Sequence, residues 1–307
     1  MGSNTILATN LRAVVSIGTN STRLLIARDR EPVLHRSIGT RLGANLKESG
    51  PLDAEGVERT LKVIDDYARE IRECGARAAA IATSAMRRAS NGDAFAREVE
   101  QRLGAPLEIL SGEREAELSF RGATANRRHK GIVGVLDVGG GSAEYAFGHE
   151  HVEGNVSCEI GAVRLSEAIP ALLGKTVPAN VGPFEAEARS YARERLGPLG
   201  SFPRPELVMS VGGTMFNAAA ILAERDREEI DGVVLARGQL GELARRFLRM
   251  DTATRRAQPR ISPQRADIFP AGLLIVDEAL GLLDVHECTI SQLDLLYGYL
   301  IEKNGER

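Results

Sequence analysis

A seven-residue pattern that occurs twice constrains the fold of this chain more than any other feature. The segments VSIGTNS (15–21) and LDVGGGS (136–142) match position for position: an apolar strand, a small polar or acidic residue, and then x-Gly-x-x-Ser before a returning strand. Repeats with periods of about 20–50 residues indicate solenoids, whereas these two copies lie much farther apart. The spacing therefore predicts a duplicated domain, with a glycine turn at the tip of a β-hairpin in each half.

Strand-like and helix-like segments alternate along the chain, which predicts an α/β fold. In the first half we expect strands at 12–17, 23–28, 34–39, 78–83 and 107–110, and helices at 53–73, 93–103 and 112–121. In the second half we expect strands at 132–137, 143–147, 155–160 and 206–211, and helices at 163–172, 183–195 and from 214. We expect the C-terminal third to be mostly helical, with a strand near 287–291 and a last helix from about 294. The charged stretch NRRHKG (126–131) separates the halves, so we expect an N-terminal domain of residues 1–126 and a C-terminal domain of residues 127–307, with the last helix free to pack back on the first domain.

Composition excludes several classes of function. Lys and Arg number 39 against 42 Asp and Glu, and a net charge of −3 argues against binding to duplex nucleic acid. Aromatic residues make up 4% with no Trp, so a base-stacking platform is not expected. The longest uncharged run, 207–223, has a polar interior and predicts no membrane span. Cys74, Cys158 and Cys288 stand far apart without zinc spacing, which indicates a reducing cytoplasm.

The loop DVGGGSAE (137–144) carries the strongest chemical signal. Three consecutive glycines let the backbone approach a ligand closely and point successive N–H groups at an anion. Asp137 before the glycines and Glu144 on the returning strand are hard oxygen ligands that suit Mg²⁺ beside phosphate. The alternative is a plain glycine hairpin with a solvated acid at each end. The loop matches neither the P-loop nor the dinucleotide fingerprint and by itself leaves both interpretations open.

Two further glycine turns follow strands. SIGTNSTR (16–23) offers side-chain donors at 20–22 and a positive charge at Arg23, although an ordinary Asn/Gly turn is the alternative. SVGGTMFNA (210–218) enters a helix, whose N-terminus attracts anions, although Thr214 capping the helix is the alternative. Three such turns fit a cleft for a chain of phosphates better than a site for a single nucleoside.

Charged side chains follow two other strands. Arg87 and Arg88 suit bidentate phosphate binding, and solvated arginines at a helix start are the alternative. Glu113, Glu115 and Glu117 lie at the start of an expected helix, where acids favour the helix dipole. The residues alone favour surface acids for all three.

Eight segments in the expected order together resemble the exopolyphosphatase / guanosine pentaphosphate phosphohydrolase (Ppx/GppA) family. They are SIGTNSTRLLIA (16–27), RLGANLKESG (41–50), ATSAMRRASN (82–91), EILSGEREAE (108–117), GVLDVGGGSAE (134–144), GAVRLSE (161–167), SVGGT (210–214) and RADIFPAGLLI (265–275). The resemblance runs from about residue 12 to residue 302 and fits the short two-domain form. It implies an α/β fold of two ribonuclease-H-like domains around a central cleft, as in the actin-like, Hsp70-like and sugar-kinase superfamily.

The resemblance also implies roles for individual residues. The base that activates the attacking water falls on Glu115, which overrides the surface interpretation of that residue. The ligands of a divalent metal, Mg²⁺ or alternatively Mn²⁺, fall on Asp137 and Glu144. The phosphate-binding residues that it implies are Gly18, Thr19, Asn20, Ser21, Arg23, Arg87, Gly139, Gly140, Gly141, Ser142, Gly212, Gly213 and Thr214.

The activity implied by the resemblance is hydrolysis of the terminal phosphoanhydride bonds of inorganic polyphosphate, with release of orthophosphate, in the cytoplasm. Guanosine pentaphosphate is the alternative substrate, and nothing in the sequence separates the two. A sugar kinase or ATPase is less favoured, because no segment indicates an adenosine pocket. We expect no duplex nucleic acid and no membrane as partner, and a homodimer stays open.

Three positions depart from the family pattern. Ser16 stands where Asp is usual, which removes one metal-facing carboxylate and raises a third alternative, a non-catalytic sensor of polyphosphate or guanosine nucleotides. Arg88 stands where an acid is more usual, and Tyr297 stands where Arg is usual. The chain ends at residue 307 without the C-terminal helical domains of the long members, so low processivity on very long chains is expected.

Overall fold

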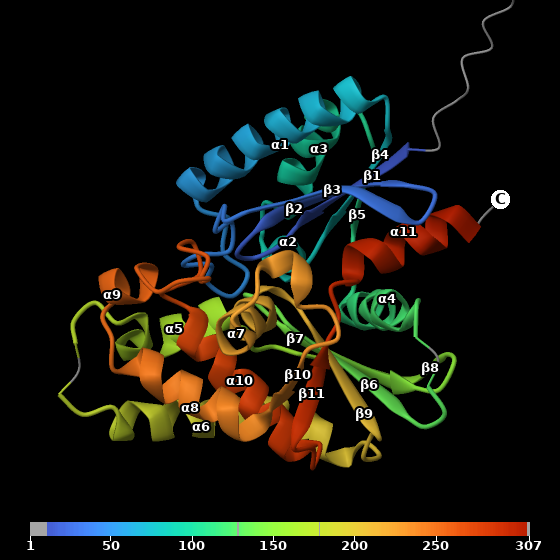
Figure 1. Cartoon of the computed structure of the whole chain (residues 1–307). Helices are drawn as coiled ribbons and strands as arrows, with labels where there is room; N and C mark the ends of the chain where they lie inside the picture. The colour runs from blue at the N-terminus through green and yellow to red at the C-terminus, as the bar shows by residue number, and fades with distance from the viewer. Residues whose placement is uncertain (1–10, 128, 178, 306–307) are drawn as a thin grey trace, which may run out of the picture.

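The computed structural model describes residues 11–127, 129–177 and 179–305, so that 1–10 and 306–307 of the expected domains lie outside the described part. Figure 1 shows two α/β domains, one above the other. In chain order the first half contains β1 (Leu11–Ile17), β2 (Thr22–Arg28), β3 (Glu31–Ile38), α1 (Ala54–Cys74), β4 (Arg77–Ala82), α2 (Ser84–Arg88), α3 (Gly92–Leu103), β5 (Leu107–Ile109) and α4 (Gly112–Thr124).

The second half follows the same alternation. It contains β6 (Val133–Val138), β7 (Ala143–Gly148), β8 (Val152–Cys158), α5 (Ala162–Ala168), α6 (Gly182–Leu196), β9 (Leu207–Val211), α7 (Gly213–Ala223), β10 (Val234–Ala236), α8 (Arg237–Leu248), α9 (Thr252–Arg256), α10 (Phe269–Leu282), β11 (Glu287–Ile290) and α11 (Leu295–Gly305). The helix expected over 163–172 is split into α5 and a 3-10 turn at Pro170–Leu173, because a proline removes a helical hydrogen bond.

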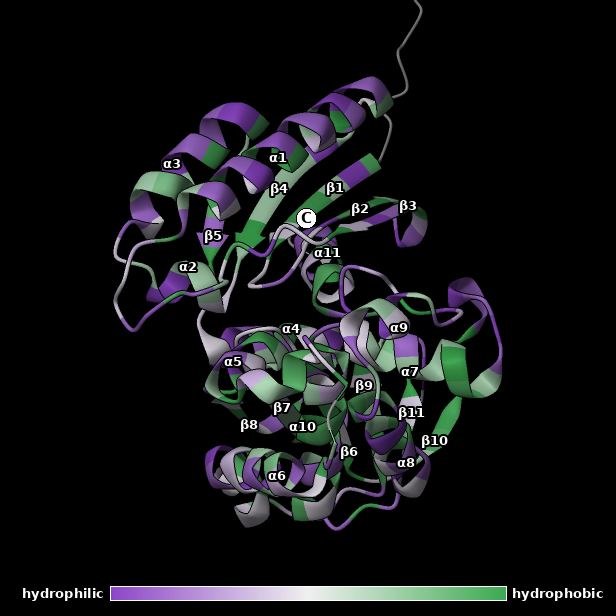
Figure 2. Cartoon of the chain, turned by 90° about the vertical axis from the view of Figure 1, so that its left-hand side faces the viewer, coloured by the Kyte–Doolittle hydropathy of each residue, from purple (hydrophilic) through white to green (hydrophobic). Residues whose placement is uncertain are grey.

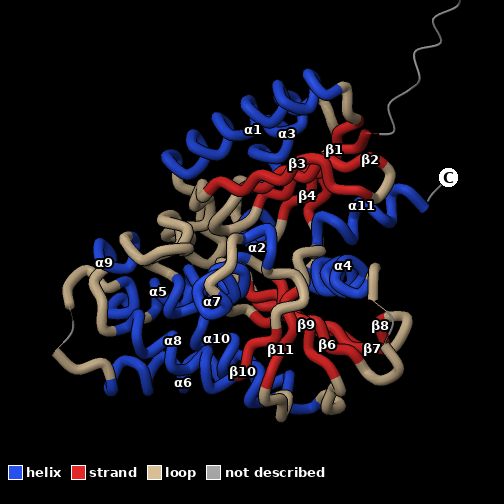
Figure 3. The backbone as a smooth tube through the Cα atoms, viewed as in Figure 1, coloured by secondary structure: helices blue, strands red, loops and turns tan. Residues whose placement is uncertain are grey.

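Both domains are built on mixed β-sheets of the same topology, seen as two red layers between helices in Figure 3. The first sheet has the strand order β3-β2-β1-β4-β5, and the second has the order β10-β11-β9-β6-β7-β8. In each sheet three strands form an antiparallel meander, and the strand that opens the meander pairs in parallel with the next strand in space. The second sheet thus repeats the first with β10 added at its edge. This ribonuclease-H-like order confirms the expected fold class.

Helices α4 and α11 cross from one domain to the other. Although α4 follows the first sheet in the chain, its Phe120 and Ala123 pack in the core of the second sheet with Met209. In return, α11 follows the second sheet and packs its Leu300 in a cluster with Val14 of the first sheet. By packing, α4 therefore belongs to the second domain, although the charged stretch expected to mark the boundary comes after this helix.

A close helix–helix crossing fixes these two exchanged helices. A Cβ atom on Gly298 of α11 would collide with the backbone carbonyl oxygen of Leu118, and a Cβ atom on Gly122 of α4 would collide with that of Asp294. Glycine is needed at both positions because the two backbones touch. Ion pairs from Arg114 and Arg121 of α4 to Glu302 of α11 extend the contact.

Apolar residues fill the two sheets and α10, while the outward sides of α1 and α3 are hydrophilic, as Figure 2 shows. Within the described ranges, no helix combines the length and the apolar character needed to cross a bilayer. Cys158 and Cys288 are buried free thiols, and Cys74 is an exposed one.

We predict that Gly298→Ala destabilises the protein. The added methyl group must push the α4 and α11 backbones apart, which costs about 1–3 kcal/mol and outweighs the gain of about 1 kcal/mol in helix propensity. Urea unfolding of the variant measures the change. Gly238→Ala in α8, where a Cβ atom meets nothing within 4 Å, is the matched control and should be neutral or stabilising. Equal stability of the two variants would contradict the tight crossing.

Candidate active site

The two glycine turns predicted from the repeat have the same hairpin closure. The Gly18 N–H donates a 3.0 Å hydrogen bond to the Ser21 carbonyl oxygen, and the Gly139 N–H donates a 3.0 Å bond to that of Ser142. Each turn connects the first two strands of its sheet, β1 to β2 and β6 to β7. The repeat in the sequence is therefore a repeat in backbone geometry.

A second segment supports each turn from behind. In the first domain the N–H groups of Arg41 and Gly43 donate 2.9 Å hydrogen bonds to the carbonyls of residues 20 and 19. In the second domain the N–H groups of Ala162 and Val163 donate 2.9 Å bonds to the carbonyls of residues 139 and 140. These supporting segments begin two of the family motifs, RLGANLKESG and GAVRLSE.

The two turns face each other across the interface between the domains. A Cβ atom on Gly140 would lie 3.1–3.2 Å from atoms of Asn20 and Thr19, and one on Gly141 would collide with the Thr19 hydroxyl. The Asn20 Oδ1 and Ser84 Oγ atoms are buried here without a hydrogen-bond partner among the described residues. The junction of the turns thus offers both backbone and side-chain polar groups to a ligand.

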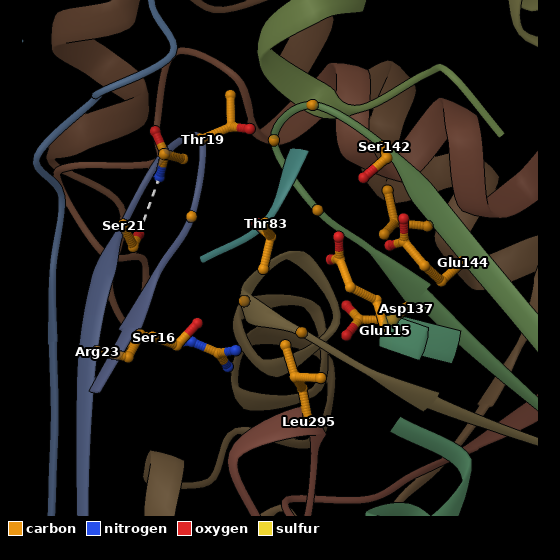
Figure 4. Close-up of a pocket in the computed structure, with 18 of the residues that line it drawn as sticks. Ser16, Thr19, Ser21, Arg23, Thr83, Glu115, Asp137, Ser142, Glu144 and Leu295 are labelled. Atoms are coloured by element: carbon orange, nitrogen blue, oxygen red, sulfur yellow. Dashed lines mark hydrogen bonds between the residues drawn. The ribbon is translucent and has the colours of Figure 1, made fainter. Parts of the chain in front are cut away.

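Three carboxylates converge on one side of the resulting cleft, as Figure 4 shows. Glu115 comes from the first turn of α4, Asp137 from β6 and Glu144 from β7. On the opposite side Ser16 and Arg23 come from the β1–β2 hairpin. The exchange of α4 is what brings Glu115 to the second domain's carboxylates.

The two copies of the hairpin differ in charge at equivalent positions. Asp137 pairs across the strands with Glu144 in the second copy, and Ser16 pairs with Arg23 in the first. One wall of the cleft is therefore acidic and the other is basic. Such a pair of walls suits an anion held on one side and a cation held on the other.

Glu115 is a buried carboxylate with one cationic partner. Its side chain is 7% exposed, and its Oε1 accepts a 2.5 Å hydrogen bond from Arg87 Nη1. Arg87 Nη1 also donates a 2.7 Å bond to the Leu110 carbonyl, which fixes the guanidinium. Burial raises the pKa of Glu115 to about 7, against the opposing effect of Arg87 and with a smaller contribution from Asp137. A carboxylate tuned to neutral pH is suited to accept a proton.

Asp137 and Glu144 are also carboxyl groups whose pKa values are raised by burial. Burial raises the pKa of Asp137, with Arg23 opposing it, and burial raises the pKa of Glu144 well above its usual range, with Glu115 adding to the effect. Ser119 Oγ donates to Asp137 Oδ2 at 3.1 Å, and Ser157 Oγ donates to Glu144 Oε1 at 2.8 Å. The hydroxyls leave oxygen lone pairs of both carboxylates for another ligand.

The residues present fit a divalent cation that shares its ligands with a substrate. In the described part of the chain, no three His, Cys, Asp or Glu side chains form a complete metal cage. Mg²⁺ is usually bound by one or two carboxylates together with water and phosphate oxygens. Asp137 and Glu144 supply such a pair of hard ligands, and the burial that raises their pKa values, with smaller contributions from neighbouring carboxylates, is a cost that a bound cation would offset.

The third glycine turn lines the cleft with its backbone. Beside it lies Arg265, which the sequence analysis did not assign to the site. Gly212, with φ +91°, and Gly213 line the cleft at the end of β9. The Arg265 guanidinium lies so close to Gly213 that a Cβ atom there would collide with it, and its Nη2 donates a 3.1 Å bond to Ser21 Oγ. Burial lowers the pKa of Arg265 to about 10, as do Arg227 and Arg23. The segment RADIFPAGLLI (265–275) contained this signal.

Two of the expected site residues lie outside the cleft wall, and the others line it. Thr214 is 3% exposed, and its side chain packs against Gly272 of α10. Arg87 reaches the cleft only through its contact with Glu115. Besides Arg265, the residues that line the cleft without having been predicted as site residues are Ser16, Thr83, Val138 and Leu295.

Two ribonuclease-H-like domains whose glycine turns face each other have the architecture of the actin-like class of folds. A model of the Ppx/GppA phosphatase family matches residues 14–305, and the chain belongs to this family. The expected family and the expected hydrolase class are thereby confirmed.

Similar proteins cover nearly the whole chain. Exopolyphosphatase 2 of Mycobacterium tuberculosis is 32% identical over 322 residues, covering 95% of this chain and 98% of the relative. The crystal structure of the Aquifex aeolicus Ppx/GppA family member is 28% identical with a TM-score of 0.79, covering 95% and 97% of the two chains. An exopolyphosphatase from Cytophaga hutchinsonii, 24% identical with a TM-score of 0.86 over 96% and 98%, has the same fold.

We predict that Arg87→Gln raises the pKa of Glu115 further. Loss of an opposite charge at hydrogen-bond distance shifts a carboxyl pKa upward by about one unit or more, so Glu115 would be protonated at a pH where it is ionised in the parent. NMR titration of selectively labelled glutamate carboxyl groups measures the midpoint. Arg88→Gln is the matched control, because Arg88 lies 3.9 Å from Glu159 rather than at Glu115. A midpoint unchanged by Arg87→Gln would contradict the coupling.

Proposed function

We propose that this protein hydrolyses the terminal phosphoanhydride bond of inorganic polyphosphate and releases orthophosphate. The observation that carries the proposal is the cleft itself, in which two opposed glycine turns lie beside a buried carboxylate with a pKa near neutrality. Family membership and the similarity to an enzyme named exopolyphosphatase support it.

The turns bind the anionic chain in this proposal. Backbone N–H groups of the turn residues 19–21 and 140–142 point at phosphoryl oxygens, with the third turn, Gly212 and Gly213, beside them. Arg23 adds positive charge on the side opposite the carboxylates, and Arg265 adds positive charge next to Ser21 and Gly213. Together these groups hold the terminal phosphoryl group in line with a water molecule, which is the main catalytic demand of phosphoryl transfer.

Glu115 is the general base. Its carboxylate orients the attacking water and accepts its proton as the water oxygen approaches phosphorus. Arg87 holds the Glu115 carboxylate in place from outside the cleft, so Arg87 acts by positioning rather than by touching the substrate. The phosphorus–oxygen bond to the rest of the chain breaks, and the shortened polyphosphate leaves with the electron pair.

Asp137 and Glu144 would hold a divalent cation, Mg²⁺ or alternatively Mn²⁺, on the acidic wall of the cleft. When bound there, such a cation neutralises charge on the phosphoryl oxygens and on the leaving oxygen. The serine at position 16 leaves these two carboxylates as the ligands that the chain supplies from its two hairpins.

Two alternatives, another substrate and a non-catalytic sensor, can be separated from this proposal by experiment. Guanosine pentaphosphate presents the same terminal phosphoanhydride, so parallel turnover of the two substrates decides between them. Ser16 favours the non-catalytic sensor, because it replaces a carboxylate in the first hairpin. A protein that binds polyphosphate but releases no phosphate with Mg²⁺ present would establish the sensor.

We predict that Glu115→Gln lowers kcat for phosphate release from polyphosphate about 10²–10⁴-fold, because the amide cannot accept the proton from water. Polyphosphate binding, measured by calorimetry, should persist because the turns are unchanged. Glu113→Gln is the matched control, since Glu113 lies in the same helical turn with an exposed side chain. Wild-type turnover by Glu115→Gln would remove Glu115 from the mechanism.

We also predict that a chelator abolishes phosphate release and that added Mg²⁺ restores it. Asp137→Asn should raise the Mg²⁺ concentration needed for half-maximal activity, because one hard anionic ligand is lost. A metal titration of activity, compared with Asp231→Asn outside the cleft, measures this shift. Full activity of the wild-type protein in excess chelator would contradict the proposed cation.

A further inference from the structure

Asp294, just before α11, places a fourth carboxylate beside the cleft. The residue is 4% exposed, and its Oδ2 pairs with Nη1 of Arg23, the guanidinium on the basic wall. Its Oδ1 accepts a 3.0 Å hydrogen bond from the Leu296 N–H. The sequence analysis assigned no role to Asp294.

The contact matters because a carboxylate and a phosphoryl group accept hydrogen bonds from a guanidinium in the same way. Each presents two anionic oxygens that accept a pair of N–H bonds. Asp294 Oδ2 therefore occupies Nη1 of Arg23, one of the donors that a phosphate in the cleft could use. Within the described residues, Arg23 has no other ion pair shorter than 4.0 Å. Its cross-strand neighbour, Ser16, is neutral.

The backbone at Asp294 cannot easily withdraw. Its carbonyl oxygen accepts a 2.9 Å hydrogen bond from the Gly298 N–H and lies where a Cβ atom on Gly122 would be. The close crossing of α4 and α11 thus fixes Asp294 in the same unit as Glu115. An incoming anion must share or displace a carboxylate that stays next to Arg23.

Other cations surround this pair. Burial lowers the pKa values of Arg265 and Arg227, and the positive charge of Arg23 adds to both shifts, as the charge of Arg227 adds to that of Arg265, so the three guanidiniums lie near one another. Asp294 is the carboxylate paired with this group. Without it, the basic wall would hold an excess of positive charge that attracts anions more strongly.

We propose that Asp294 competes with phosphate for Arg23 and thereby weakens the hold of the cleft on the orthophosphate product. Asp294 is then a positioning residue that sets how much of Arg23 is available. The proposal rests on the proposed function, because it takes Arg23 to be a phosphate-binding group. A long chain held at several turns depends less on Arg23 than does a single orthophosphate.

The test is orthophosphate affinity of Asp294→Asn, measured by calorimetry and as the inhibition constant of orthophosphate against polyphosphate hydrolysis. We expect about tenfold tighter orthophosphate binding, the size of one charge-assisted hydrogen bond regained by Arg23. Asp294→Glu should restore weak binding because it restores the carboxylate. Adding Arg23→Gln to Asp294→Asn should abolish the gain.

Asp231→Asn is the matched control. Asp231 also pairs with an arginine, Arg127 at 2.7 Å, and accepts a 2.9 Å bond from the Gln292 N–H of the same segment, but it does not line the cleft. Its orthophosphate affinity should equal that of the wild type. The proposal is overturned if Asp294→Asn binds orthophosphate within twofold of the wild type, or if Asp231→Asn shows the same gain.

Poor folding of the variant does not remove the test. Asp294→Ser keeps an oxygen for the Leu296 N–H and replaces Asp294→Asn if that variant is unfolded. If neither variant folds, added orthophosphate must restore folding by replacing the carboxylate, and failure to do so overturns the proposal. Polyphosphate turnover by the wild type tests the proposed function separately. If the wild type hydrolyses polyphosphate but Asp294→Asn leaves orthophosphate affinity unchanged, the proposed function stands and only the role of Asp294 is overturned.

Discussion

The contact between two hairpin turns, one of which has only glycines at its tip, is the constraint on which the rest of the structure depends. Gly140 and Gly141 lie against Thr19 and Asn20, and larger residues there would separate the domains. This contact sets the distance between the sheets and leaves the turn N–H groups beside the cleft. The supporting segments hold the two turns from behind, and the buried carboxylates lie beside them.

Duplication followed by divergence explains how one fold provides two different walls. The hairpins keep the same backbone closure, but one carries Asp137 and Glu144 where the other carries Ser16 and Arg23. Burial disfavours the charged form of a carboxylate and raises the pKa values of Glu115 and Glu144, and neighbouring carboxylates add to both shifts. The cleft therefore retains an electrostatic cost that a cation and a phosphate chain would offset on binding.

The sequence predicted what depends on local pattern. Strand alternation, helix periodicity and the repeated glycine turns located the main elements and most of the cleft, while the 3-residue β10 and 5-residue α2 were too short to show a period. Thr214 follows the right turn but packs against Gly272, and Arg265 reaches Ser21 from 244 positions away. Such contacts depend on the packing of distant segments, which neither periodicity nor spacing encodes. The residues alone did not distinguish Glu115 from the acids near it, and the resemblance to a family assigned Glu115 its role.

The exchange of α4 and α11 has a consequence for how the chain acquires its structure. One face of the first sheet is covered by α11, which follows the whole second sheet in the chain, so that face stays uncovered until the second domain has been synthesised. The nascent N-terminal domain would then expose Val14, Leu25 and Ile81 on the ribosome, a surface of the kind that chaperones bind. Neither half has a complete core alone, so the two domains should unfold in one cooperative transition rather than in sequence.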